Sequence, residues 1–323
     1  MRTKTRAAAG GATALLVLAA AVWLAWPGGS KAPHGGTSPK PTAQTTLLVR
    51  PPGASVASPT VGCFAKPSAC GWPDASTTGA SGILRVVGPI AKTTEGEVIE
   101  NLAVTGHITV TSAEVTIRNV SIVGDAGLAA IDAHAAPGPV TIDHVTVTYP
   151  DGVFPVSAGA IWGRSGLTVR SSNISGSPDG IDASGDPVLI EDNWVHDLRY
   201  NIRTKSHDDA IQTLAGNIVI RHNTLDATSP GSNSCLQIGN LLGNLEQLTF
   251  ENNLCDGGGY SINANPANLL AGKVTAGPLN FVGNRFGRDF KYGLRAHLSA
   301  PFTVNWSNNV SDADGRPVPG VRE

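Results

Sequence analysis

Short pairs of apolar residues, with one residue between the two members, recur along most of the chain. Each pair begins an apolar-x-apolar-x-x-x-x-apolar pattern, and the pairs are Val115–Ile117, Val140–Ile142, Leu167–Val169, Val188–Ile190, Ile218–Ile220, Leu248–Phe250, Leu279–Phe281 and Phe302–Val304. Their first residues lie 25, 27, 21, 30, 30, 31 and 23 positions apart. Two-residue alternation is typical of strands, and repeats of this length are typical of solenoids. The pattern predicts an all-β protein, a β-solenoid.

An asparagine lies five residues after the start of four successive pairs. These residues are Asn193, Asn223, Asn253 and Asn284. A side-chain amide has both a donor and an acceptor, so it can bond to the same amide in the next coil and satisfy a buried polar turn. We therefore interpret these asparagines as structural.

Each coil also contains a second short strand in which an Ile or Leu faces the core. Alternation turns the following residue outward. The resulting outward column reads Asp132, Trp162, Asp182, Gln212, Gln237, Asn263 and Arg295. Amides, carboxylates, one tryptophan and an arginine suit a groove that binds an extended sugar chain, and Tyr200 is a further candidate stacking platform on a loop over this groove.

The densest charge in the chain lies within residues 203–212, although only 15% of all residues are charged. This stretch contains Arg203, Lys205, His207, Asp208 and Asp209. So many charged side chains in one short stretch indicate a catalytic site, and we take these five residues as candidate catalytic residues.

Two further carboxylates, Asp179 and Asp182, lie one repeat before Asp209 and Gln212. On adjacent coils the four carboxylates would crowd one face, which raises carboxyl pKa values or recruits a cation. A single aspartate often caps a tight turn by accepting backbone N–H bonds. For the cluster as a whole we favour function.

The periods and the asparagines together resemble the right-handed parallel β-helix of the pectin-lyase-like superfamily, over roughly residues 95–310. The resemblance implies about eight coils. Fold alone does not decide the function within such a superfamily.

One resemblance within that superfamily is to the polygalacturonase-type glycoside hydrolases. Residues 179–182 read Asp-Gly-Ile-Asp, and residues 208–212 read Asp-Asp-Ala-Ile-Gln. The resemblance implies that Asp179, Asp208 and Asp209 protonate the leaving oxygen and activate a water. The chain departs from the family at Ser232-Asn233-Ser234, where Gly-His-Gly is expected, and no Arg-Ile-Lys follows.

The other resemblance is to the polysaccharide lyases of the same superfamily. It implies a calcium ion held by Asp179, Asp182 and Asp209, with Lys205 as the base and Arg203 as its partner or as a clamp for the uronate carboxylate. A lysine acts as a base only when its pKa is lowered, which a neighbouring cation can do.

We therefore expect an extracellular lyase that cleaves a uronate-containing polysaccharide by β-elimination. A hydrolase with paired aspartates is the first alternative. A non-catalytic carbohydrate-binding or cell-envelope protein is the second.

The N-terminus carries the features of an export element. Arg2, Lys4 and Arg6 precede an apolar run over residues 7–26 that is long enough to span a bilayer. We predict a signal peptide or membrane anchor at 1–26, a disordered linker rich in Pro, Gly, Ser and Thr at 27–60, an N-terminal cap at 61–95 and the β-helix at 96–323. The main domain is then secreted or faces outward from the cell membrane.

Charge and cysteines complete the expectations. A formal net charge of −2 gives no reason to expect nucleic acid as a partner, and we expect a monomer that binds a polysaccharide.

Cys63 and Cys70 lie close together in an exported chain and predict a disulfide. Alternation turns Cys235 outward and Cys255 inward, so we expect no bridge between these two.

Overall fold

The computed structural model describes residues 62–155, 159–239 and 242–320. The predicted export segment and linker lie outside these residues. The described part of the chain is almost entirely β, with 22 strands, two 3-10 helices (η1, Cys63–Ala65; η2, Pro67–Cys70) and one α-helix (α1, Ala267–Leu270). None of its helices is long and apolar enough to cross a membrane.

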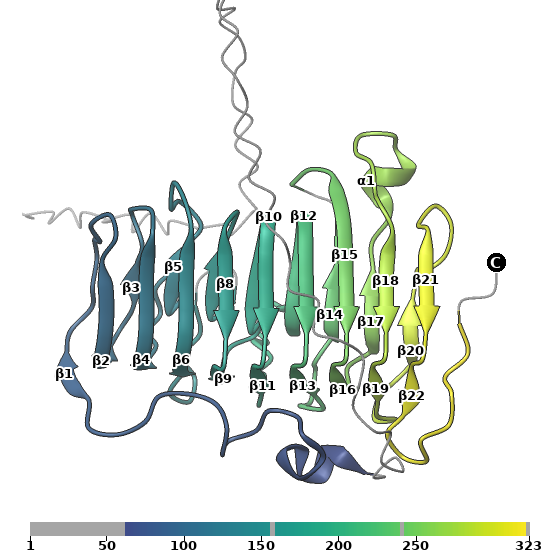
Figure 1. The fold of residues 1–323 in the computed structure, drawn as a ribbon, viewed down its shortest axis with the longest axis horizontal. Coiled ribbons are helices and arrows are strands. Elements are labelled where there is room, and N and C mark those ends of the chain that lie inside the picture. The colour runs from purple at the N-terminus through teal and green to yellow at the C-terminus, as the bar shows by residue number, and fades with distance from the viewer. Residues whose placement is uncertain (1–61, 156–158, 240–241, 321–323) are drawn as a thin grey trace, which may run out of the picture. The chain divides into compact units, whose positions relative to one another are not determined.

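The strands pair in parallel, each with the strand one repeat further along the chain, as expected for a solenoid. Five long strands bend and contribute to two faces: β2 (Val98–Thr105), β4 (Val115–Val123), β6 (Val140–Thr148), β10 (Ile181–Glu191) and β12 (Asp209–Arg221). The remaining strands each belong to one of three faces, which we call sheets 1, 2 and 3 (Figure 1).

Sheet 1 contains the first apolar pair of each repeat and adds β8 (Leu167–Arg170), β15 (Leu245–Glu251), β18 (Leu279–Val282) and β21 (Val304–Ser307). Sheet 2 adds β1 (Arg85–Val87), β9 (Asn173–Ser175), β11 (Trp194–His196), β13 (Thr224–Ala227), β16 (Leu254–Gly257), β19 (Arg285–Phe286) and β22 (Val310–Ser311). Sheet 3 adds β3 (Ile108–Thr109), β5 (Ile131–Ala133), β7 (Ile161–Gly163), β14 (Ser234–Ile238), β17 (Tyr260–Ala264) and β20 (Gly293–Ala296).

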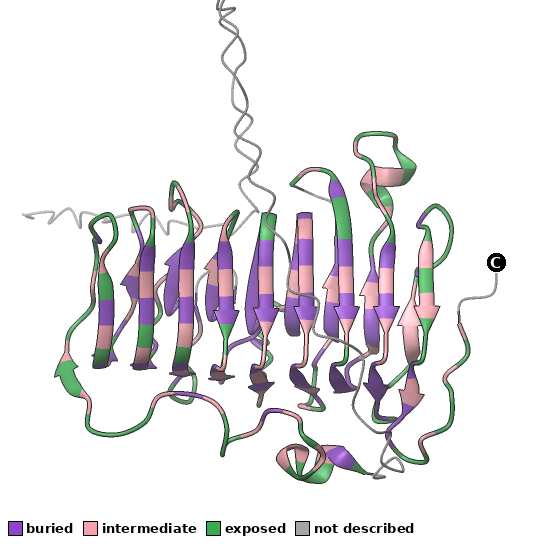
Figure 2. Cartoon of the chain, viewed as in Figure 1, coloured by how far each residue is buried: buried purple, intermediate pink, exposed green. Residues whose placement is uncertain are grey.

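The core lies between the three sheets and consists mainly of Val, Ile, Leu and Phe. Along sheet 1, buried and partly exposed residues alternate, so buried bands cross the neighbouring strands at the same height (Figure 2). Within β4, for example, Val115 and Ile117 are buried while Thr116 between them is not. Seven of the eight apolar pairs predicted from the sequence, all but Phe302–Val304, are therefore core positions of sheet 1.

A single left-handed residue turns the chain from sheet 1 to sheet 2 in nearly every repeat. The non-glycine members have φ values between 49° and 58°, and they are Asn101, Asn119, His144, Ser171, Asp192, His222, Asn252 and Asn308. Asn is enriched in this conformation because its short polar side chain can bond locally. The residue that follows each corner points into the interior.

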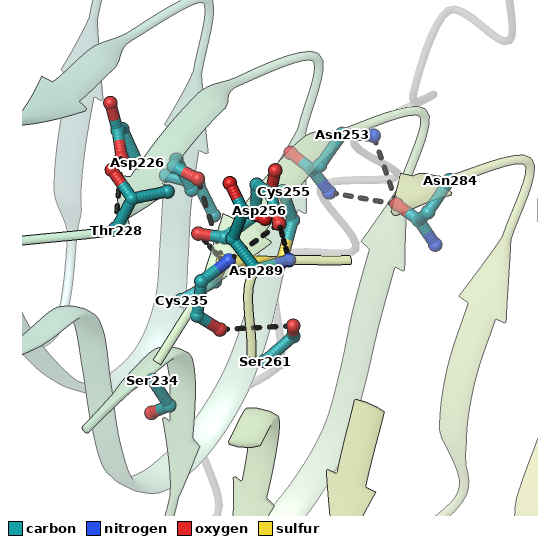
Figure 3. Close-up of a disulfide and its surroundings, with 12 residues drawn as sticks. Asp226, Thr228, Ser234, Cys235, Asn253, Cys255, Asp256, Ser261, Asn284 and Asp289 are labelled. Atoms are coloured by element: carbon teal, nitrogen blue, oxygen red, sulfur yellow. Dashed lines mark hydrogen bonds between the residues drawn. A yellow bond between two sulfur atoms is a disulfide. The ribbon is translucent and has the colours of Figure 1, made fainter. Parts of the chain in front are cut away.

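The predicted asparagine ladder is confirmed at this inward position. The Asn193 side-chain amide donates to Oδ1 of Asn223 at 3.0 Å, and Asn223 donates to Asn253 at 2.9 Å. The ladder continues through Asn284 at 3.2 Å to Asn309 at 2.9 Å (Figure 3 shows the Asn253–Asn284 step). Backbone carbonyl groups accept the second amide hydrogen of each step, so the amides are satisfied.

Two register predictions at the C-terminal end are wrong. Leu279 pairs with Val304, not with Phe302, so the last repeat is longer than predicted and its ladder residue is Asn309. Arg295 pairs with Ile262, not with Asn263. The Arg295 guanidinium instead donates to the carbonyl groups of Pro319 and Gly320, because the chain end folds back over this last repeat.

Residues 62–84 run along the corner between sheets 1 and 2 in the direction opposite to the repeats (Figure 1). The backbone of Cys63 donates to Asp312 in the last repeat, and the Trp72 indole donates to the carbonyl of Asn252. Further along, Gly79 donates to the carbonyl of Ser171. The expected N-terminal cap thus begins as a segment that contacts the corners of successive repeats before it reaches β1.

Both cysteine pairs form disulfides. The Cys63–Cys70 bridge is confirmed. The prediction for the second pair is wrong, because Cys235 and Cys255 are bridged and fully buried (Figure 3). Cys235 lies at the start of β14 just after a corner, where alternation does not hold: the residue before the inward Leu236 is covered as well.

Candidate functional site

The outward column predicted from the sequence lies on sheet 3, and we call it the polar column. Six of its seven residues are aligned as predicted. Neighbouring strands pair Asp132 with Trp162, then Asp182, Gln212, Gln237 and Asn263 in order. Burial divides this column into two parts. The tryptophan and the amides are partly exposed, whereas the carboxylates Asp132 and Asp182 keep only 4% and 8% of their surface exposed.

The carboxylates of adjacent repeats come together at the entrance to β10 and β12. Oδ1 of Asp179 accepts the backbone N–H of Asp209 at 2.8 Å, and the N–H of Gly180 donates to the carbonyl of Asp209 at 2.9 Å. A Cβ at Gly180 would lie 2.4 Å from Cγ1 of Val195. Glycine at this position therefore permits the close approach of the two repeats.

Asp208 and Asp209 have no exposed surface. Oδ1 of Asp208 accepts the Ser206 hydroxyl at 2.7 Å, and Oδ1 of Asp209 accepts the Asn233 amide at 2.7 Å and the Ser234 hydroxyl. Their Oδ2 atoms are buried and have no hydrogen-bond partner in the described residues. Because buried polar atoms are almost always paired, two orphaned carboxylate oxygens in one place are unusual.

Burial raises the pKa of all four carboxyl groups. For Asp179 the pKa lies well above the usual range, because of burial and the charge of Asp209. Burial raises the pKa of Asp182 to about 7, against the opposing charge of Arg164. It raises the pKa of Asp208 to about 7 as well, and that of Asp209 to about 6 despite hydrogen bonds from Ser234 and Asn233. The cluster therefore shares protons near neutral pH.

The candidate cations Arg203 and Lys205 lie on an exposed turn ahead of β12, and His207, which follows, is also exposed. The carbonyl of Asn201 accepts the N–H groups of Thr204 and Ser206 and so closes this turn. Lys205 adopts a left-handed conformation with φ of 52°. Neither Arg203 nor Lys205 forms an ion pair with a described carboxylate.

Calcium binding by Asp179, Asp182 and Asp209 stays a prediction. In the described part of the chain, no group of three or more His, Cys, Asp or Glu side chains converges to hold a metal ion. One oxygen of Asp179 and one of Asp209 already accept hydrogen bonds, and calcium needs 6–8 oxygen ligands. We therefore assign no chemical step to a metal.

Other residues support the column in ways that the sequence did not reveal. The Asn233 amide bridges Asp209 and Oε1 of Gln237, at 2.7 and 3.2 Å. The ring of Trp162 stacks on His134 at a centroid distance of 3.8 Å. Asn233 occupies the segment in which the hydrolase pattern has Gly-His-Gly, and that position was the one available signal for its role.

Tyr200 is 38% exposed and lies against the backbone of the following repeat. A Cβ at Gly231 would lie 2.9 Å from Cβ of Tyr200, so the glycine makes room for the tyrosine. The exposure is compatible with the predicted stacking role.

Comparisons with known proteins found no family model, no curated protein and no solved structure that matches this chain.

Proposed function

We propose that this chain is a right-handed parallel β-helix of about eight coils and that it hydrolyses glycosidic bonds of an extracellular polysaccharide. The sugar chain would lie across the partly exposed residues of the polar column, Trp162, Gln212, Gln237 and Asn263. Tyr200 would contact it from the adjacent loop. The hydrolase is favoured over the lyase because the carboxyl groups of adjacent repeats converge, whereas neither Arg203 nor Lys205 forms an ion pair with a described carboxylate.

One observation carries the proposal: four carboxyl groups with raised pKa values share one place, and two of their oxygens have no partner among the described residues. A raised pKa alone does not separate the cluster from a turn cap: Asp74 caps a turn and has a pKa of about 2, whereas burial raises the pKa of Asp256, which also accepts backbone N–H groups, to about 6. The unpaired oxygens of Asp208 and Asp209, beside polar and partly exposed neighbours, favour acid–base chemistry over capping.

The reacting groups in this proposal are Asp179 and Asp182, which keep 9% and 8% of their surface exposed. One of them would hold a proton for the leaving oxygen, and the other would be ionised to accept a proton from the attacking water. Asp208 and Asp209 are too deeply buried to contact a sugar in this conformation. Their charge would instead keep a proton on the outer pair.

A lyase is the second candidate, because Arg203 and Lys205 lie on the exposed turn that leads into β12, the strand that begins with Asp209. In this case Lys205 would be the base, with Arg203 beside it on the same turn.

The test uses the purified full-length chain with a panel of neutral and uronate polysaccharides, each with calcium and with a chelator. New reducing ends without unsaturated-uronate absorbance are expected. Absorbance that disappears with the chelator would replace the hydrolase with the lyase. No product from any member of a broad panel would favour the non-catalytic binding protein.

A further inference from the structure

A hollow of about 490 Å³ opens at the corner between sheets 3 and 1. We call it the corner pocket. It forms because three successive repeats turn this corner with short loops, and its walls include His134, Pro137, Pro139, Arg164, Asp186 and Pro187. Its volume falls within the range of small-molecule sites, about 300–1,000 Å³.

Two opposite charges line the corner pocket without pairing. Arg164 and Asp186 are exposed, and neither forms an ion pair with a described residue. The arginines of sheet 1 behave differently. Arg118, Arg170 and Arg221 each pair with a carboxylate of the preceding repeat, at 2.5, 3.0 and 2.7 Å.

The remaining wall is rigid and partly apolar. Nδ1 of His134 lies 2.5 Å from Oδ1 of Asp132, and its ring stacks on Trp162, so its orientation is held from two sides. The Ser165 hydroxyl accepts the backbone N–H of Asp186 at 3.2 Å, which joins two of the loops. Prolines and alanines supply flat apolar surface between these polar groups.

We propose that the corner pocket binds one neutral pyranose residue of the polysaccharide. Arg164 would donate to sugar oxygens, Asp186 would accept from sugar hydroxyls, and the ring would lie on the proline surface. A neutral sugar is favoured over a uronate because Asp186 lies in the pocket, Asp132 is bonded to the lining residue His134, and Asp182 lies within reach of the charge of Arg164. Burying a further carboxylate among them would be opposed by like charge. This inference rests on the proposed function and names the class of sugar for it.

The position of the corner pocket indicates how it would contribute to the proposed reaction. Arg164 is close enough to Asp182 for its charge to oppose the rise in the pKa of that carboxyl group. Asp182 pairs with Trp162 on the neighbouring strand, two residues before Arg164, so a sugar residue held by Arg164 would lie on the same face as Asp182. The pocket would then set which glycosidic bond is presented to the carboxyl pair.

The test is calorimetric titration of the purified full-length chain with β-1,4-linked hexasaccharides of glucose, mannose and xylose, and with hexagalacturonate. We expect saturable binding of at least one neutral oligosaccharide. Arg164→Ala and Asp186→Ala should each weaken it about 10-fold or more, as expected for a lost hydrogen bond to a charged group. Arg170→Ala is the matched control, since Arg170 is an exposed arginine outside the corner pocket, and it should bind about as tightly as the wild type. Circular dichroism checks that each variant is folded.

Tighter binding of hexagalacturonate than of every neutral oligosaccharide would overturn the inference. Wild-type affinity in both folded pocket variants would also overturn it. If polysaccharides are hydrolysed but no neutral oligosaccharide binds, the pocket assignment fails and the proposed function stands. If neutral oligosaccharides bind through Arg164 but nothing is hydrolysed, the proposed function fails and the pocket stands.

Discussion

Two buried polar stacks cross successive repeats of this protein, and they differ in how well their atoms are satisfied. In the ladder from Asn193 to Asn309, each amide bonds to its neighbour through a matched donor and acceptor. In the cluster of Asp179, Asp208 and Asp209, two oxygens have no partner among the described residues, and burial raises every carboxyl pKa. Both stacks are buried, so the difference does not come from access to water.

The difference follows from the chemistry of the two groups. An amide has a donor and an acceptor, so identical amides can bond along the axis of a solenoid indefinitely. A carboxylate only accepts, so neighbouring carboxylates must share a proton or leave oxygens unpaired. A stacked Asn therefore needs no function to explain it, whereas a stacked buried Asp costs stability that a purely structural role would not require.

The largest expected effect is on the ladder. Asn253→Leu removes the acceptor of the Asn223 amide. It also removes the amide that donates to the backbone carbonyl of Ile220 and to Oδ1 of Asn284. We expect a loss of about 3–5 kcal/mol in the free energy of unfolding, measured by urea denaturation.

The control for that variant is Asn280→Ala in the same part of the fold. Asn280 is partly exposed and accepts from Asn305 at the surface of sheet 1. It should cost less than about 0.5 kcal/mol. Equal losses at the two positions would remove the distinction between the ladder and an ordinary surface amide.

The next effect is on catalysis by the carboxyl cluster. Asp182→Asn keeps the shape of the side chain but removes the titrating group, and kcat on the cleaved polysaccharide should fall about 10²- to 10⁴-fold. Stability should not fall, because the buried carboxyl group is not required for any hydrogen bond found in the described residues. Asp209→Ala should likewise abolish activity without loss of the β-sheet circular-dichroism signal. Loss of folding in Asp209→Ala would assign Asp209 to a structural role through its bonds to Asn233 and Ser234, and loss of folding in Asp182→Asn would contradict the expectation that its carboxyl group is dispensable for stability.

A smaller effect, opposite in sign to that of Asn253→Leu, is expected in the way the free energy of unfolding depends on pH. Between about pH 4 and pH 7 the folded protein holds more protons on the buried carboxyl groups than the unfolded chain does, since their pKa values are raised. The contribution of these groups to stability therefore falls as pH rises through that range. Asp208→Asn should stabilise the protein by on the order of 1–2 kcal/mol at pH 8 and by little at pH 4. A stability gain that is the same at both pH values would show that ionisation of Asp208 is not its cause.

The smallest effect concerns recognition at the edge of the site. Tyr200→Ala should raise KM about 3- to 10-fold and leave kcat nearly unchanged, because the ring contributes binding surface and no titrating group. Steady-state kinetics on the same polysaccharide separates the two constants. A fall in kcat without a change in KM would place Tyr200 at the chemistry instead of at binding.

Much of the fold could be predicted from the sequence because its signals are local and repeated. The apolar pairs of sheet 1, the ladder asparagines and the alignment of Asp182 with Gln212 all follow from two-residue alternation within a recurring period. The errors occurred where the period is interrupted. Phe302 was placed out of register, and Cys235 was assigned outward, because a corner changes the direction of the chain and alternation no longer decides which side is covered.

The sequence by itself determined the strand pattern, the ladder and the membership of the acidic cluster, since each depends on residue type and spacing. Only the tertiary structure decided which carboxyl groups keep exposed surface, that Lys205 and Arg203 are exposed on a turn, and that Arg164 and Asp186 line one pocket without an ion pair to any described residue. Burial, pKa and pocket shape depend on what three successive repeats place around an atom. Those neighbours lie a full repeat away along the chain, so no local pattern of residues encodes them.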